Sequence, residues 1–84
     1  MYYVYMLICR DGTLYTGITV DLERRMAEHN GSKLGAKYTG ARRPVRLAYS
    51  EKFKNRSDAS KEEARVKKLS REEKLKIIRS ADKK

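Results

Sequence analysis

The chain has 84 residues, of which 39% are hydrophobic and 38% are charged. This length allows one small domain, and the apolar fraction is too high for a disordered polyelectrolyte. Lysine and arginine outnumber aspartate and glutamate by 21 to 11, so the formal net charge is +10. A charge of this sign and size attracts polyanions. We therefore expect nucleic acid as the partner, DNA before RNA, and a monomer is the favoured state.

Composition argues against three further classes of protein. No run approaches the ~18 apolar residues of a membrane span, and the N-terminal residues lack the pattern of a signal peptide. We therefore expect a cytoplasmic protein without a membrane partner. A single cysteine, Cys9, and a single histidine exclude an internal disulfide and a zinc site of the usual ligands within one chain. Because Cys9 lies in an apolar run, we expect it in the core.

The first twenty residues predict a β-hairpin. Residues 2–9 are continuously apolar or aromatic, which is typical of a strand buried on both faces. The pair Asp11-Gly12 then indicates a hairpin turn, because both residue types tolerate a positive φ. Residues 14–18 predict the returning strand, antiparallel to the first.

A helix is expected next, from about Asp21 to Asn30. Asp21 or Thr19 can cap its first turn, and Asn30-Gly31 supplies the left-handed stop. The two possible caps are not distinguished by the sequence.

A basic loop and a third strand follow this helix. Residues 31–43 are rich in glycine and cations and too polar to bury. Pro44 can begin an edge strand, in which Val45, Leu47 and Tyr49 alternate with other residues and are expected to share one face.

Two helices complete the chain. The first is expected to begin at Ser57 or Asp58 and to run to about Lys68. The second begins with a capping box, in which Glu73 reaches back to the amide of Ser70, and runs to about residue 79.

Together these elements predict an α/β fold with the order β-β-α-β-α-α. A small three-stranded antiparallel sheet is flanked by helices, because a hairpin and a crossover strand form the sheet on which the helices pack. We expect a single domain over residues 1–80 and a basic C-terminal tail over residues 81–84.

Polar residues interrupt the core-facing side of the first predicted helix. Its spacing places Leu22, Arg25, Met26 and His29 on one side. Leu22 and Met26 belong to the core, whereas Arg25 and His29 are expected at its rim. There they either serve a site or only extend past the core edge. Just before this helix, Gly17 is placed to permit close approach by another backbone or a ligand.

Glu63 occupies the core-facing side of the later helix, whereas Glu62 is expected to face outward. A carboxylate aimed at a core is costly unless it is paired or binds a metal. A capping box with Ser60 or an ion pair with Lys67 would also explain Glu63, and helical spacing leaves these alternatives open.

Five motifs in the chain resemble those of the GIY-YIG nuclease superfamily. They are Tyr3-Val4-Tyr5, Tyr15-Thr16-Gly17, the segment 21–25, Glu28-His29-Asn30 and the segment 59–63. Their order matches the family over nearly the whole chain, which is similar to the small stand-alone members and to structure-specific endonucleases that cut branched DNA. The resemblance implies a GIY-YIG fold and a phosphodiesterase that hydrolyses DNA with one divalent metal ion, Mg²⁺ or Mn²⁺.

The resemblance also implies roles for individual residues. Tyr15 helps to activate the attacking water, with Tyr5 beside it, and His29 shares in proton transfer. Arg25 matches the catalytic arginine and Glu63 the metal ligand. The chemistry is consistent, since Mg²⁺ needs only one or two carboxylates and a guanidinium forks onto phosphate oxygens. Without the resemblance, ordinary sheet packing would explain both tyrosines.

The chain departs from the family pattern at three points. Tyr3 stands where the first motif has glycine, which is expected to alter packing more than chemistry. Ile18 stands where several repair members carry lysine, so one cation near the active tyrosine is missing. No asparagine follows Glu63, although some members place a functional asparagine there.

The basic loop is a candidate nucleic-acid contact. Lys37, Tyr38, Arg42 and Arg43 combine an aromatic ring with cations, a mixture that stacks bases and holds phosphates, although a solvated loop would look the same. We expect a metal-dependent endonuclease that acts on structured or damaged DNA. The alternatives are a non-catalytic nucleic-acid-binding protein with the same fold and a subunit of a DNA repair complex.

Overall fold

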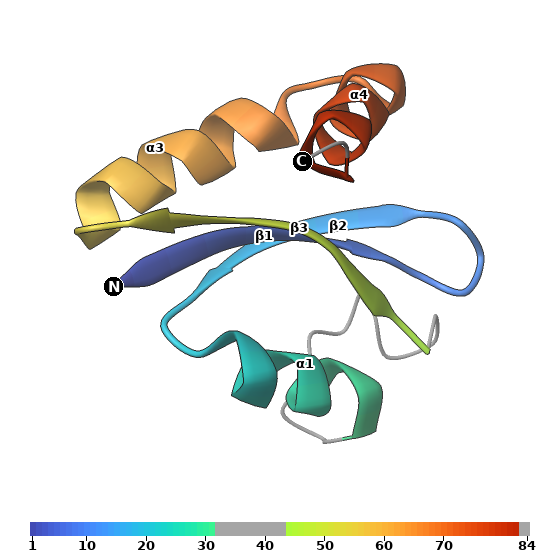
Figure 1. Cartoon of the computed structure of the whole chain (residues 1–84), viewed down its shortest axis with the longest axis horizontal. Coiled ribbons are helices and arrows are strands. Elements are labelled where there is room, and N and C mark those ends of the chain that lie inside the picture. The colour runs from blue at the N-terminus through green and yellow to red at the C-terminus, as the bar shows by residue number, and fades with distance from the viewer. Residues whose placement is uncertain (32–43, 83–84) are drawn as a thin grey trace.

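The computed structural model describes residues 1–31 and 44–82. Its strands are β1 (Tyr2–Ile8), β2 (Leu14–Thr19) and β3 (Arg46–Phe53), and its helices are α1 (Leu22–Gly31), α3 (Arg56–Lys67) and α4 (Arg71–Asp82). The sheet has the order β2-β1-β3, and both pairs of neighbouring strands are antiparallel. Helix α1 covers one face, and α3 and α4 lie on the other (Figure 1). The predicted α/β fold and its element order are confirmed.

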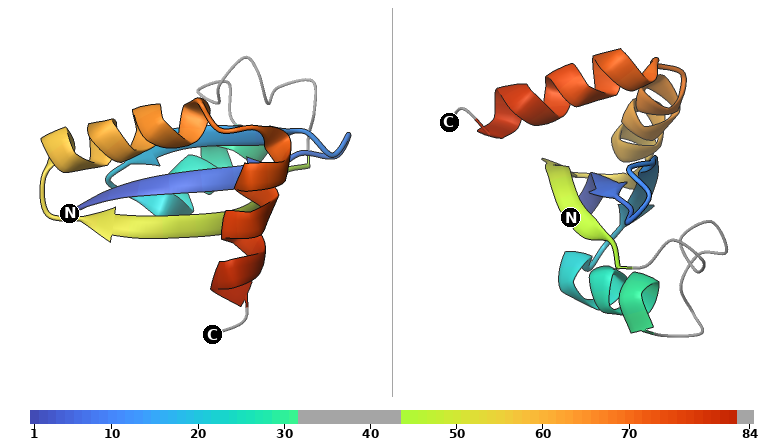
Figure 2. Two further views of the ribbon diagram at one scale, coloured as in Figure 1. Left: turned by 90° about the horizontal axis from the view of Figure 1, so that it is seen from above. Right: turned by 90° about the vertical axis from the view of Figure 1, so that its right-hand side faces the viewer.

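The strand β1 is central and supplies both cores. Val4 to Leu7 are all buried, as the apolar run predicts. Because side chains alternate along a strand, Tyr5 and Leu7 pack in one cluster with Cys9 and Val45, to which Leu22 and Met26 of α1 are added. Met6 packs on the other face with Val66 and Ile78, from α3 and α4. From above, α3 runs along the strands, while α4 crosses them and projects past β3 (Figure 2).

The strand β3 is longer than predicted and does not keep its alternation. A bulge between Met6 and Leu7 places Leu47 opposite Leu7 but Tyr49 opposite Met6. The expectation that Val45, Leu47 and Tyr49 share one face is therefore wrong. Val45 packs in the α1-side core, Tyr49 packs against the opposite one, and Leu47 is exposed. An inserted residue at a bulge shifts the side-chain pattern by one position.

The hairpin turn uses three residues instead of two. The Gly12 amide donates to the Cys9 carbonyl, and the Cys9 amide donates to the Thr13 carbonyl, each at 2.9 Å. Only Gly12 takes a positive φ, of 84°, and the Asp11 carboxylate accepts from the Thr13 amide and hydroxyl. A type I turn followed by a left-handed glycine closes such a loop. From α4, Arg71 donates to the Gly12 carbonyl at 2.6 Å and so ties the turn to that helix.

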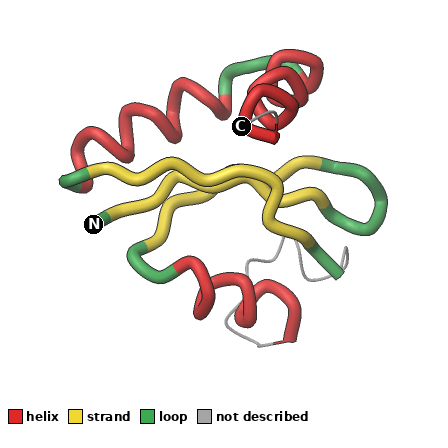
Figure 3. The backbone as a smooth tube through the Cα atoms, viewed as in Figure 1, coloured by secondary structure: helices red, strands yellow, loops and turns green. Residues whose placement is uncertain are grey.

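Helix caps agree with the sequence at two of three positions. Asp21 accepts from the Arg24 amide at 3.1 Å, and Ser70 and Glu73 form the predicted capping box. The expected start of α3 at Ser57 or Asp58 is wrong, because Asn55 is the N-cap and accepts from the Asp58 amide at 2.8 Å. The loops that join the elements are short in the described parts of the chain (Figure 3). In these parts no helix is both long and apolar enough to cross a membrane.

Candidate active site

A buried pair of polar rings lies between the sheet and α1. The hydroxyl of Tyr5 is 3.0 Å from Nε2 of His29, and the two residues are 1% and 0% exposed. The expectation that His29 sits at the rim of the core is therefore wrong. The helical spacing correctly placed His29 on the core-facing side of α1. It could not show that His29 is fully buried, because the imidazole is buried against the hydroxyl of Tyr5, which belongs to a distant strand.

Gly17 makes room for this pair. It is the cross-strand neighbour of Tyr5, and the Tyr5 ring lies directly over its backbone. A Cβ atom at Gly17 would lie 2.5 Å from the Tyr5 hydroxyl oxygen, 2.7 Å from its Cζ and 3.1 Å from Cε2 of Tyr15. The close approach at this glycine is thus made by aromatic side chains of the protein instead of by another backbone.

Tyr15 completes an aromatic cluster with Tyr5 and His29. The ring centroids of Tyr15 and His29 are 5.3 Å apart in an edge-to-face arrangement, and those of Tyr5 and Tyr15 are 6.4 Å apart. Edge-to-face packing of this kind is favourable for aromatic pairs. Tyr15 is half-buried, so the cluster extends from the interior towards solvent.

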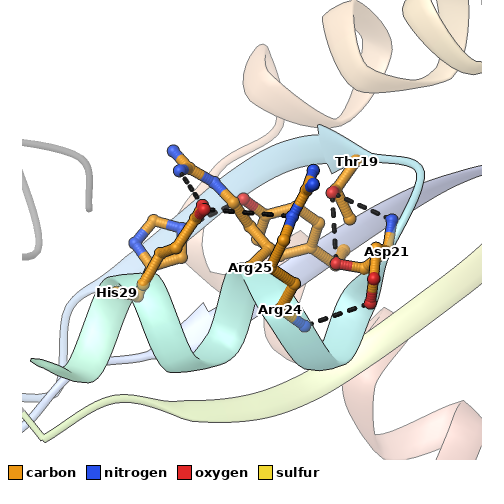
Figure 4. A network of polar contacts seen from close by, with 7 residues as sticks. Thr19, Asp21, Arg24, Arg25 and His29 are labelled. Atoms are coloured by element: carbon orange, nitrogen blue, oxygen red, sulfur yellow. Dashed lines mark hydrogen bonds and ion pairs between the residues drawn. The ribbon is translucent and has the colours of Figure 1, made fainter. Parts of the chain in front are cut away.

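Arg25 lies over the cluster from α1 and is held by a carboxylate of the same helix. Its Nη1 is 2.9 Å from Oε1 of Glu28, whose other oxygen is 3.9 Å from Nε of Arg24 (Figure 4). The spacing of three residues between Arg25 and Glu28 is the usual one for such a pair. Arg25 also influences the two buried rings, because its guanidinium lowers the pKa of His29 and opposes the rise of the Tyr5 pKa.

Burial keeps the buried pair uncharged near neutral pH. Desolvation raises the pKa of the Tyr5 phenol above its ordinary value of 10.0, against the hydrogen bonding and positive charge of Arg25. Desolvation and then the charge of Arg25 lower the pKa of His29 below 6.5, and Glu28 opposes this. Tyr5 is therefore a neutral hydroxyl, and His29 is a neutral imidazole able to accept a proton.

Glu63 belongs to α3, which lies on the face of the sheet opposite α1 (Figure 1). Desolvation is the largest cause that raises the Tyr5 pKa, and the negative charge of Glu63 is the smallest. Its side chain is 21% exposed and pairs with Lys67 at 3.3 Å, which confirms that alternative. The expectation that Glu62 faces outward is wrong, since its side chain is only 18% exposed and pairs with Arg65 through both oxygens.

The carboxylate of Glu63 fits a hydrated magnesium ion better than a fully protein-bound metal. Over residues 1–31 and 44–82, no group of three or more histidine, cysteine, aspartate or glutamate side chains is placed to hold a metal. Mg²⁺ keeps several waters and is commonly held by one or two carboxylates together with substrate phosphates. One half-buried carboxylate such as that of Glu63 is compatible with that donor set.

Two residues of this region were not recognised from the sequence for what they do. Asn30 was expected to stop α1, and its side chain also pairs with the backbone of Val45, accepting from the amide at 2.7 Å and donating to the carbonyl at 3.1 Å. It thereby joins the end of α1 to the start of the third strand. Glu28 was only part of a motif, although its spacing from Arg25 was a visible signal. The predicted nucleic-acid contacts of the basic loop (Lys37, Tyr38, Arg42 and Arg43) lie outside the described residues.

Comparison with known proteins identifies the family of this arrangement. A family model described as the GIY-YIG catalytic domain matches residues 1–76. The chain belongs to the GIY-YIG family. The expectation drawn from the five motifs is thereby confirmed, and the aromatic cluster around Gly17 is formed by residues of the first, second and fourth of them.

Relatives of this GIY-YIG protein resemble it over most of their length. A UPF0213 protein of Syntrophus aciditrophicus is 54% identical over 77 residues, which cover 92% of this chain and 88% of that protein. The solution NMR structure of a protein from E. faecalis has a TM-score of 0.67 and 45% identity, with 99% and 88% of the two chains covered. That of a UPF0213 protein from Bacillus halodurans has a TM-score of 0.60 and 44% identity, with 93% and 83% covered.

Proposed function

We propose that this GIY-YIG domain is a DNA endonuclease that hydrolyses a phosphodiester bond with the help of a divalent metal ion, and that its substrate is structured or damaged DNA. One observation carries the proposal. Tyr5, Tyr15 and His29 form a single cluster over Gly17, and Arg25 and Glu63 both act on that cluster electrostatically. These residue types can supply proton transfer, phosphate binding and a metal ligand.

The protonation states of the buried pair assign a route for the proton of the attacking water. Tyr5 is protonated near neutral pH and so does not act as a free phenolate. It can pass its proton to Nε2 of His29, 3.0 Å away, while its oxygen takes the proton of the water. In this scheme Tyr15 helps to orient and activate the water from the half-buried side of the cluster. The water becomes a hydroxide, and His29 becomes an imidazolium.

Arg25 and Glu63 serve the phosphate. The guanidinium of Arg25 is only partly exposed, with 26% of its side chain accessible, and its planar fork suits two phosphate oxygens. Without substrate, the guanidinium of Arg25 is paired with Glu28 at 2.9 Å. A bound phosphate would compete with Glu28 for this guanidinium. Glu63 would hold the metal ion, which when bound polarises a non-bridging phosphate oxygen and stabilises the leaving oxygen.

The proposal is tested by cleavage of labelled branched and single-stranded DNA with Mg²⁺ or Mn²⁺. We expect Glu63→Gln and Arg25→Ala to lower the rate by roughly 100-fold or more, the size of effect seen when one charge-stabilising group is removed. Glu62→Gln is the matched control, because Glu62 is adjacent on α3 and equally half-buried, and it should leave the rate nearly unchanged. DNA binding without cleavage in the presence of either metal would contradict the proposed activity and favour a non-catalytic binding protein.

A further inference from the structure

We infer that a recess at the end of the sheet binds a phosphodiester group of a DNA strand that passes through the active site. The recess has a volume of about 250 Å³ and lies where β1 begins and β2 ends. Arg24 enters it from α1 and Arg56 from the first turn of α3, so the two guanidinium groups come from opposite layers of the molecule (Figure 1). The inference rests on the proposed function and extends it to a second point of contact with the substrate.

The charge around the recess favours an anion. Its lining contains two arginines and no carboxylate. Arg56 is exposed and has no ion pair with any residue that the structure describes. Arg24 is bound only loosely, at 3.9 Å from Glu28, with 63% of its side chain exposed. The neighbouring carboxylate of Asp21 is engaged as the cap of α1, where it accepts from the Arg24 amide.

The other walls of the recess suit the sugar and base that accompany a phosphate. Tyr2 is half-buried and offers an aromatic surface, and Val20 is 55% exposed beside it. Cations that hold the backbone next to aromatic rings that stack bases are the usual combination in proteins that bind single strands. The sugar or base of a bound strand would therefore contact the exposed side chain of Val20. A free anion would have no use for these apolar walls.

The position of the recess makes it a flanking subsite of the same active site. Arg24 and Arg25 are consecutive in α1 and share the carboxylate of Glu28 (Figure 4), and of the two only Arg24 lines the recess. In the sheet, the pair Tyr3 and Thr19 lies next to the recess, two residues along from the pair Tyr5 and Gly17. Two strand residues span about 6.8 Å. A strand with its reacting phosphate over the tyrosines can therefore place a neighbouring one between the two arginines.

The inference is tested by measuring binding without turnover. Fluorescence anisotropy of a labelled single-stranded oligonucleotide in EDTA compares the wild type with Arg56→Gln and with Arg79→Gln. Arg79 is an exposed residue of α4, a helix that contributes no residue to the lining of the recess. We expect Arg56→Gln to weaken binding several-fold. The slope of log affinity against log salt should fall by about 0.7, the loss of one phosphate contact on a single strand. Arg56→Lys should restore most of the slope, and Arg79→Gln should change neither quantity.

The outcomes separate this inference from the proposed activity. Equal binding and equal salt slopes for Arg56→Gln and Arg79→Gln would overturn the recess as a subsite, even if the protein cuts DNA. A selective loss in Arg56→Gln would uphold it, even if no DNA is cut. Millimolar inorganic phosphate is the second probe. If the oligonucleotide shifts the amide NMR signals of Val20 and Arg56 and phosphate does not, the recess is a site for a nucleic-acid strand. If phosphate causes identical shifts, the recess is only a site for a free anion.

Discussion

The two faces of the sheet are filled in opposite ways. On the side of α3 and α4, Met6 packs with Val66 and Ile78 in an apolar core. On the side of α1, the fully buried side chains include Tyr5 and His29, and the hydroxyl of Tyr5 lies 3.0 Å from Nε2 of His29. Burying polar groups is costly unless they are hydrogen-bonded. In this small domain one face is therefore filled by apolar side chains, and the other encloses the polar pair to which the proposed function assigns the chemistry.

The comparison also explains why Glu63 is unusual. It belongs to a helix of the apolar face, yet its charge acts on Tyr5 of the polar face. Helix α3 contacts β2, an edge strand of six residues in which Gly17 pairs with Tyr5. The edge of the sheet is where the two faces meet and where the proposed active site lies.

Of the substitutions considered, Gly17→Ala should have the largest effect on stability and cleavage, because it disturbs the Tyr5–His29 pair on the α1 side of the sheet. Its Cβ would lie 2.5 Å from the hydroxyl oxygen of Tyr5, a residue too deeply buried to move freely. We expect a loss of about 1–3 kcal/mol in the free energy of unfolding, as for other overpacked sites. Activity should fall by roughly 100-fold in the protein that remains folded, because the Tyr5–His29 pair is displaced. Urea denaturation and DNA cleavage by the same preparation measure the two effects.

A double mutant distinguishes this clash from a general intolerance of alanine in β2. In a Tyr5→Leu background the ring that meets the new Cβ is gone, so Gly17→Ala should cost much less stability than in the wild type. If Gly17→Ala lowers the free energy of unfolding equally in the wild type and in Tyr5→Leu, Gly17 is required for a reason other than the space occupied by the Tyr5 ring.

The polar face should also give the domain a pH dependence of its own. His29 has a pKa below 6.5 in the folded protein, so the unfolded chain binds its proton more readily. The stability from neutral His29 is complete above pH 6.5 and is lost as the pH falls through the folded pKa. His29 is the only histidine, and Glu62, whose pKa is lowered from 4.5, loses its contribution only below that value. The melting temperature should therefore fall between pH 6.5 and 5.

An NMR titration of the His29 imidazole provides the direct check. Its midpoint should lie below 6.5, and Tyr5→Phe should shift it, because the phenol is the group that contacts Nε2. A midpoint at or above 6.5, or a melting temperature that does not change between pH 6.5 and 5, would contradict the assignment of His29 as a neutral acceptor.

Much of the fold followed from local signals in the sequence. The apolar run of β1, the Asp11-Gly12 turn and the capping box at Ser70 each act within a few residues, and each was predicted correctly in kind. One error arose where distant residues decide, since the bulge in β3 depends on its pairing with β1. The start of α3 was missed although its signal is local, because asparagine is a favoured N-cap and Asn55 accepts from an amide only three residues away.

The candidate site was predictable as a set of residues but not as an arrangement. Family motifs named Tyr5, Tyr15, Arg25 and Glu63, and helical spacing put His29 on the correct side of α1. Neither could show that His29 is fully buried against Tyr5, because that contact joins residues 24 positions apart. The part played by Glu63 across the sheet edge depends likewise on how two helices pack on opposite faces.

Thr16→Val tests the apolar side of the sheet, which α3 and α4 cover. It should have the smallest effect on stability. Thr16 precedes Gly17 in β2, pairs with Met6 and is 4% exposed, and its hydroxyl has no hydrogen-bond partner among the residues that the structure describes. A buried hydroxyl without a partner lowers stability, whereas a methyl group in its place does not. The free energy of unfolding should stay unchanged or rise by about 1 kcal/mol, seen as an unchanged or higher urea midpoint at constant slope. Cleavage should be unaffected. A loss of more than ~1 kcal/mol would mean that a buried water satisfies the hydroxyl, and that this face is polar at its edge as well.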